Sequence, residues 1–241
     1  MEDEHRAQSA IEALVRKSSR RAEPADIARE LKELGRGPAA RPRHPDSRVT
    51  FLANILDNHG DARGVENRSG AVACIGDYVA RQFGQRKVVA GKDARLAALP
   101  WREAGVLPRF GVVESGDKVS VSYARRAIAE TGSVILESGR DSPVSNSLLA
   151  ENHIVLVDAA DVFDRLEDAW QSKPVAAEAY RPRCLQIISG PSSTADIALN
   201  MVYGAQGPKA WLVILIAADG PALARTAREV AAIRARPGAH S

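Results

Sequence analysis

The stretch AWLVILIA, residues 210–217, is eight apolar residues long and carries no charged or turn-forming side chain. Two similar runs precede it, HIVLV at 153–157 and LQII at 185–188. Short runs of this kind, rich in branched side chains, indicate buried strands. We expect three buried strands there. Further strands are expected at 87–90, 111–113, 119–122 and 133–136.

Helical patterns alternate with these runs. Residues 161–170, DVFDRLEDAW, place Val162, Leu166 and Ala169 on one helical face, and residues 221–235 form another amphipathic pattern after the last run. Strands that are apolar throughout and alternate with helices are typical of parallel sheets covered on both faces. The sequence therefore predicts an α/β fold with a mostly parallel sheet flanked by helices.

The N-terminal part differs from the rest of the chain. Helical patterns occur at 11–15 and 24–34, and a Pro- and Arg-rich segment follows at 35–47. A segment of this composition is typical of an extended linker. We expect a helical arm with its linker at 1–44, an α/β domain at 45–236, and a disordered tail at 237–241.

Composition excludes several classes of protein. There are 33 Lys and Arg against 30 Asp and Glu, and no aromatic residues interleave with the basic segments, so nucleic-acid binding is not expected. Cys74 and Cys184 are too few and too far apart for a metal or iron-sulfur site, so we expect no resident cofactor or metal. No apolar run approaches the ~20 residues of a membrane span, and the polar N-terminus favours the cytoplasm.

The segment ISGPSST, residues 188–194, joins the run at 185–188 to an expected short helix. Gly190 and Pro191 favour a turn, and the hydroxyls of Ser192, Ser193 and Thr194 can cap free amides. One interpretation is simple capping, in which Ser193 and Asp196 form a capping box. The other is an anion site at the start of the helix. No P-loop and no dinucleotide-binding glycine motif is present.

Two further polar positions are candidates. Glu130, Thr131 and Ser133 surround Gly132 between apolar segments, either as a structural corner or as a site in which Glu130 is a general base or binds a hydroxyl. His153 opens a strand, where it either hydrogen-bonds a backbone carbonyl or acts in catalysis. Both alternatives stay open for both positions.

The motifs AIAETGSVIL (127–136), NHIVLV (152–157), ISGPSSTADI (188–197) and the G-x-x-GP turn at 204–208 together resemble the LUD domain of lactate utilisation protein C, the LutC/YkgG family. The resemblance covers roughly residues 45–218. It implies a fold similar to the ribose-5-phosphate isomerase and CoA-transferase (NagB/RpiA-like) group. It also implies a role in bacterial oxidation of L-lactate to pyruvate beside iron-sulfur partner proteins.

The resemblance and the turn chemistry together define the candidate site. Glu130 and Asp196 are the catalytic candidates. The expected ligand-binding residues are Thr131, Gly132, Ser133, Ser189, Gly190, Ser192, Ser193, Thr194 and Gln206. Two departures weaken acid-base chemistry, because Ala198 stands where the family usually has Glu and Gln206 where it usually has His.

The function expected from these features is a LUD-domain subunit that binds a small carboxylate or phosphate, or organises a lactate oxidation complex. An independent enzyme of the isomerase, CoA-transferase or folate cyclo-ligase type and a non-catalytic scaffolding protein stay open as alternatives, as does a homo-oligomer. Whether the chain is itself an enzyme is not decided by its sequence.

Overall fold

A computed structural model of the chain describes residues 24–34, 41–172, 182–195 and 201–234. The chain divides into two compact units, Met1–Ala40 and Arg41–Ser241. In the first unit the helix expected at 24–34 is confirmed as α2 (Pro24–Leu34), which opens with a proline as helices often do. The helix expected at 11–15 and the tail expected at 237–241 lie outside the described residues.

The second unit is built on a six-stranded sheet in which every neighbouring pair is parallel, in the order β1-β12-β7-β4-β2-β3. Its strands are β1 (Asp61–Val65), β2 (Lys87–Ala90), β3 (Leu107–Phe110), β4 (Val119–Tyr123), β7 (Asn152–Asp158) and β12 (Ala210–Ile216). The strands expected at 87–90, 119–122, 153–157 and 210–217 are therefore confirmed, with ends that differ by a few residues.

The strand expected at 111–113 is wrong. Strand β3 ends at Phe110, and the amide of Gly111 still donates to Ala90. The amide of Val113 donates instead to the side chain of Asn146 at 2.9 Å. The chain therefore leaves the sheet after Gly111, and the side chain of Asn146 replaces a neighbouring strand as the partner of the Val113 amide.

A second sheet of four strands has the order β8-β5-β6-β9. Its strands are β5 (Arg126–Ile128), β6 (Ser133–Glu137), β8 (Val162–Phe163) and β9 (Leu185–Ile188). The strands expected at 133–136 and 185–188 are confirmed. The expected burial of 185–188 is wrong, because β9 pairs only with β6 at the edge of this sheet and Ile187 is 48% exposed.

Two expected helices differ from the structure. Helix α7 (Leu166–Gln171) is shorter than the pattern at 161–170, because Val162 and Phe163 pair with β5 as strand β8. The helix expected after the turn at 188–194 is wrong where it is described. Residues Ser193–Ala195 (β10) pair antiparallel with Met201–Tyr203 (β11), so Ser193 and Thr194 cap no helix. Asp196 and Ala198 lie outside the described residues.

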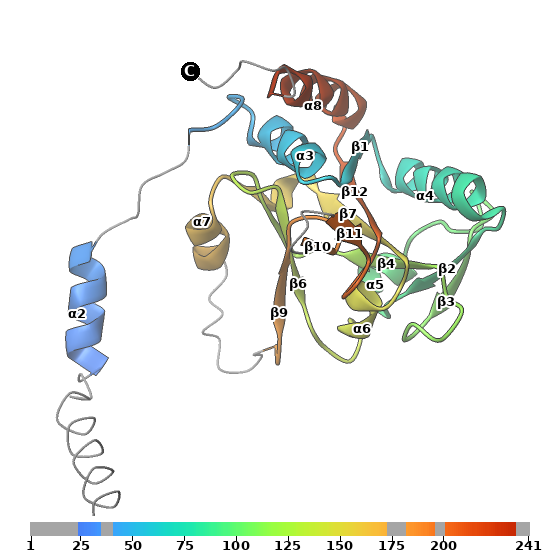
Figure 1. The fold of residues 1–241 in the computed structure, drawn as a ribbon, viewed down its shortest axis with the longest axis horizontal. Coiled ribbons are helices and arrows are strands. Elements are labelled where there is room, and N and C mark those ends of the chain that lie inside the picture. The colour runs from blue at the N-terminus through green and yellow to red at the C-terminus, as the bar shows by residue number, and fades with distance from the viewer. Residues whose placement is uncertain (1–23, 35–40, 173–181, 196–200, 235–241) are drawn as a thin grey trace, which may run out of the picture. The chain divides into compact units, whose positions relative to one another are not determined.

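Helices cover both faces of the parallel sheet. Helices α3 (Ser47–Asp57) and α8 (Gly220–Arg234) lie side by side on one face, as Figure 1 shows, and α4 (Arg68–Phe83) and α5 (Ala94–Ala97) cover the other. The α/β fold with a mostly parallel sheet flanked by helices is thus confirmed. Among the helices in the described ranges, none has the length and apolarity that crossing a bilayer requires.

The contact between β1 and the start of α8 gives a test of this packing. A Cβ atom at Gly64 would lie 1.9 Å from the carbonyl oxygen of Gly220. We expect Gly64→Ala to lower the free energy of unfolding by about 3 kcal/mol, because backbone must move to admit the methyl group. The measurement is urea unfolding followed by circular dichroism.

Gly70→Ala is the matched control for that substitution. A Cβ atom there would meet its nearest neighbour, Val65, at 3.4 Å, which is ordinary contact. Gly70 lies inside α4, so alanine is expected to leave stability unchanged or raise it by up to about 1 kcal/mol. Equal effects of the two substitutions would contradict the close packing of β1 on α8.

Candidate functional site

The turn between β5 and β6 is fixed against the C-terminal end of α3. The buried side chain of Asn54 donates to the carbonyl oxygens of Ala129 and Glu130, at 2.7 and 3.2 Å, and Asn58 donates to Thr131 at 2.9 Å. Gly132 has φ of 65°, and a Cβ atom there would lie 2.7 Å from the backbone of Asn54. Only glycine fits this position, so the turn is held in one place.

A row of three hydroxyls crosses from this turn to the end of β9. The hydroxyl of Ser133 lies 2.6 Å from that of Thr131 and 2.6 Å from that of Ser189. Ser133 is 1% exposed, whereas Thr131 and Ser189 are exposed at the two ends. We call Thr131, Ser133 and Ser189 the hydroxyl row. It joins two motifs that are 56 residues apart in the sequence.

Close backbone approach also fixes the second end of the row. A Cβ atom at Gly190 would lie 2.6 Å from the carbonyl oxygen of Asn58. The glycine therefore allows the chain after β9 to pass over the end of α3. As a result, Thr131 and Ser189 are both positioned by the last turn of the same helix.

Ser192 belongs to a neighbouring group of contacts. Its amide donates to Pro208 at 2.9 Å, its carbonyl accepts from Gly204 at 2.8 Å, and its hydroxyl accepts from the amide of Gln206 at 3.3 Å. The structure thus brings Ser192 together with the G-x-x-GP turn. Ser193 and Thr194 are exposed on β10, and no described contact joins their side chains to the hydroxyl row.

Glu130 has a structural contact. Its carboxylate oxygen accepts from the amide of Leu166 at 3.0 Å, which caps the first residue of α7. Its own amide donates to the carbonyl of Asp164 at 3.1 Å. A carboxylate at a helix start is stabilised by the free amides there. The assignment of Glu130 as a general base stays a prediction, and Asp196 is not described.

His153 is buried inside the sheet. Its Nε2 atom lies 2.9 Å from the hydroxyl of Ser122, and burial lowers the pKa of the imidazole to about 3. The expected carbonyl partner is therefore a hydroxyl. His153 lies at the amino end of β7, beside Ser120 and Trp211 in the neighbouring strands. Within the described residues its Nδ1 atom, the Ser120 hydroxyl and the Trp211 indole nitrogen have no hydrogen-bond partner.

Sequence reasoning missed a crevice at the carboxyl end of the parallel sheet. It has a volume of about 380 Å³ and is lined by residues that follow β2, β4 and β6. Charged and aromatic side chains in its lining include Asp93, Arg95, Tyr123, Arg125, Glu137 and Arg140. The signal for it is GKDAR directly after 87–90 and YARR after 119–122, because polar residues that follow parallel strands meet at one edge.

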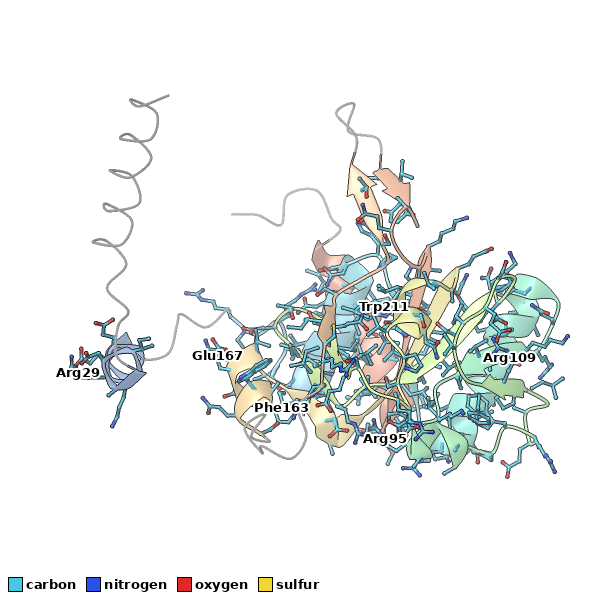
Figure 2. The ribbon with its side chains drawn as sticks, turned by 90° about the horizontal axis from the view of Figure 1, so that it is seen from below. Arg29, Arg95, Arg109, Phe163, Glu167 and Trp211 are labelled. Atoms are coloured by element: carbon cyan, nitrogen blue, oxygen red, sulfur yellow. The ribbon has the colours of Figure 1, made fainter. Side chains whose placement is uncertain are left out.

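Side chains in the wall of this crevice contact one another and the backbone. The guanidinium of Arg95, a residue labelled in Figure 2, lies 4.1 Å from the ring centre of Tyr123 and donates to the carbonyl of Ala124 at 3.0 Å. The Tyr123 hydroxyl donates to Asp158 at 2.8 Å. Burial, together with this carboxylate, raises the pKa of Tyr123 well above its ordinary value, so the phenol stays protonated.

The pH dependence of stability tests the burial of His153. Since the pKa of the folded-state imidazole lies below the unfolded value of roughly 6.5, only the unfolded chain takes up a proton as the pH falls. The free energy of unfolding should therefore decrease below pH 6.5, by up to about 1.4 kcal/mol per pH unit from this residue. Urea unfolding at pH 7, 6 and 5 should show a smaller decrease in His153→Gln than in the parent. Equal decreases in both proteins would refute the assignment.

The segment that holds the candidate motifs is similar to proteins of one family. The LUD domain family matches residues 118–216. "Lactate utilization protein C" of Macrococcus caseolyticus is 30% identical over 142 residues, which cover 54% of this chain and 61% of that protein. "Uncharacterized protein YkgG" of Escherichia coli is 32% identical over 152 residues, which cover 56% of this chain and 65% of that protein. The matches thus span less than two thirds of either relative.

A solved structure supports the fold. The crystal structure of a DUF162 family protein from Deinococcus radiodurans aligns with a TM-score of 0.50 and 21% identity, over 74% of this chain and 99% of that one. It shows the α/β fold alone, and the more specific NagB/RpiA-like similarity is not confirmed. The hydroxyl row and the G-x-x-GP turn both lie within residues 118–216, the segment that matches the LUD domain family. The resemblance of the chain to the LUD domain, LutC/YkgG family of lactate utilisation protein C is therefore confirmed.

Proposed function

We propose that this chain is a LUD-domain subunit of a bacterial lactate utilisation system and binds a small carboxylate at the hydroxyl row. The observation that carries the proposal is the pair of 2.6 Å contacts that link Thr131, Ser133 and Ser189. The name of one relative, lactate utilization protein C, supports the pathway.

The hydroxyl row has the chemistry that a small carboxylate needs. Each hydroxyl has one donor and two acceptor sites, so a hydroxyl that accepts from its neighbour keeps its own donor for a ligand. Ser133 is buried and can accept a hydrogen bond from one of the exposed hydroxyls, Thr131 or Ser189, while it donates to the other. Hydrogen bonds in such a chain strengthen one another. The two contacts use two of the three hydroxyl hydrogens, so one end hydroxyl, that of Thr131 or of Ser189, keeps its donor for a carboxylate oxygen.

Oxidation of lactate to pyruvate releases two electrons, which need an acceptor. In this proposal iron-sulfur partner proteins take them, in the cytoplasm, and this chain binds the substrate or product. Cys74 and Cys184 are both free thiols, and within the described ranges no group of acidic, histidine and cysteine side chains could hold a metal. The proposal therefore assigns to this chain the binding of the carboxylate, and to its partners the transfer of electrons.

A second candidate function is the organisation of a complex without ligand binding. The observation that favours it is a row of exposed apolar side chains on β11, where Met201, Val202 and Tyr203 are 48%, 52% and 40% exposed. The two strands of this hairpin project beyond the rest of the second unit in Figure 2. An apolar strand in this position can contact a partner protein.

Isothermal titration with L-lactate and pyruvate tests the carboxylate site. Thr131→Val and Ser189→Ala each remove one end of the hydroxyl row, and a lost hydrogen bond to a charged ligand costs about 1.5–3 kcal/mol. We expect affinity to fall about tenfold or more in the variant that loses the donating hydroxyl, and less in the other variant. Thr226→Val is the control, because Thr226 is half-buried on α8, away from the hydroxyl row, and its hydroxyl donates within the helix to the carbonyl of Ala222. The absence of binding to the parent protein would remove the carboxylate site from the proposal.

Co-expression with the iron-sulfur proteins of a lactate oxidation system tests the second candidate. Val202→Asp should abolish co-purification, because it places a charge in the exposed apolar row. Ile233→Asp is the matched control, since Ile233 is 61% exposed on α8. Co-purification that survives Val202→Asp would rule out the hairpin as the contact, and loss in both variants would show a nonspecific effect of the added charge.

A further inference from the structure

The crevice at the carboxyl edge lies where the connections of the parallel sheet change direction. From β2 the chain passes outward to β3, whereas from β4 it passes the other way to β7 and then β12. Strands β2 and β4 are neighbours, with Ala90 paired to Val121. In open parallel sheets the carboxyl ends of two such strands leave a space between them, and ligands bind there. The crevice of about 380 Å³ occupies this point.

The charged side chains of one wall of the crevice, Asp93 and Arg95, already have partners within the protein. The amide of Arg95 and its guanidinium both donate to Asp93, at 2.8 and 3.2 Å, and the guanidinium also donates to the carbonyls of Tyr123 and Ala124. Burial opposes the charge of Asp93, but these hydrogen bonds hold the pKa of its carboxyl below the ordinary value. Asp93 and Arg95 thus neutralise each other and form a fixed surface.

The acidic group on the opposite wall is neutralised from behind. Glu137 accepts from Arg126 at 3.0 Å, and both side chains are largely buried. Arg126 is held further by the hydroxyl of Ser172 at 3.3 Å. The carboxylate of Glu137 therefore presents little uncompensated negative charge to the crevice.

Two arginines that line the crevice, Arg125 and Arg140, are not engaged in a strong ion pair with any described residue and can bind a ligand. The side chain of Arg125 is 51% exposed, and its nearest ion-pair partner, Asp93, is 3.8 Å away and already bonded to Arg95. Arg140 is exposed, and in the part of the chain that the structure describes it forms no hydrogen bond or ion pair. Both guanidinium groups can therefore turn to a ligand without breaking a strong contact.

A tight turn places Arg140 at the mouth of the crevice. Gly139 and Ser142 exchange two backbone hydrogen bonds, at 3.0 and 3.2 Å, so Arg140 and Asp141 form the tip of the turn. A Cβ atom at Gly91 would lie 2.6 Å from the carbonyl oxygen of Asp141. The absence of a side chain at Gly91 therefore lets this turn approach the end of β2.

We propose that the crevice between β2 and β4 binds a small organic phosphate, with Arg125 and Arg140 on the phosphate group. A guanidinium fork matches two oxygens, and a phosphate has enough oxygens for two forks, whereas a carboxylate has two oxygens in all. The volume of about 380 Å³ lies in the range of pockets for whole metabolites and exceeds what lactate fills. Asp141 at the mouth opposes a polyanion, which favours a phosphate monoester. The site shares no residue with the hydroxyl row.

Isothermal titration of the full chain with AMP, inorganic phosphate, adenosine and L-lactate tests this site at constant ionic strength. We expect AMP and inorganic phosphate to bind and adenosine to bind at least tenfold more weakly than AMP. Arg125→Gln/Arg140→Gln should weaken AMP binding at least tenfold and leave lactate binding at the hydroxyl row unchanged. Arg225→Gln is the control, because Arg225 is exposed on α8 and its loss changes the net charge equally per site.

Arg140→Lys and Arg140→Gln keep the test decisive if the double variant unfolds, since Arg140 has no structural contact to lose. Lysine keeps the charge without the fork, so it should restore only part of the affinity. The proposal is overturned if neither phosphate compound binds, or if both bind the double variant as they bind the parent. It is also overturned if lactate binding is the property that the double variant loses, because the crevice would then be a carboxylate site.

Discussion

The parallel ladder between β7 and β12 is the interaction on which the second unit depends. It pairs seven residues, from Asn152 with Ala210 to Asp158 with Ile216, and the five central residues of each strand are buried. Side chains on both faces of these strands must therefore be apolar or uncharged, as the neutral His153 illustrates. The carboxylate of Asp158 lies at the end of β7, where it accepts from the hydroxyl of Tyr123. The ladder thus decides both the core and the edge at which a ligand can bind.

The end of α3 is the second constraint, because it connects the small sheet to the body of the unit. Asn54 accepts from Arg43 at 2.9 Å and donates to two carbonyls of the turn after β5. Gly132 and Gly190 allow two loops to approach the same helix end. Through these backbone contacts Thr131 and Ser189, which are distant in the sequence, are held at the ends of one hydroxyl row.

The parts of the fold that the sequence predicts are those whose burial is decided locally. Runs 153–157 and 210–217 are apolar on both faces, so their burial is readable from the residues alone. Strand β1 is not, because only Ala62 of its sequence DARGV is buried and its polar residues hide the pattern. The two-residue strand β8 depends on pairing with the distant strand β5, whereas β10 and β11 pair with each other. In both cases strand pairing overrides the local helical pattern.

The candidate site also has one part that can be predicted from local sequence and one part that depends on how the strands are arranged. The members of the hydroxyl row follow from two motifs that can be read along the chain. The crevice depends on the adjacency of β2 and β4, and β3 lies between them in the sequence. The polar residues GKDAR and YARR are visible there, but nothing local shows that they share an edge. Strand order, which the long-range ladders set, was the missing information.

The hairpin of β5 and β6 links the two proposed sites. Its turn carries Thr131 and leads into Ser133, whereas its open end carries Arg125 and Glu137. Four residue steps along β6 separate Ser133 from Glu137, which is about 13 Å of strand. A small carboxylate cannot span that distance, so the two sites must bind separate molecules. Because the hairpin is fixed by Asn54 at one end and by the buried pair of Arg126 and Glu137 at the other, a ligand that shifts either end must strain the same two strands.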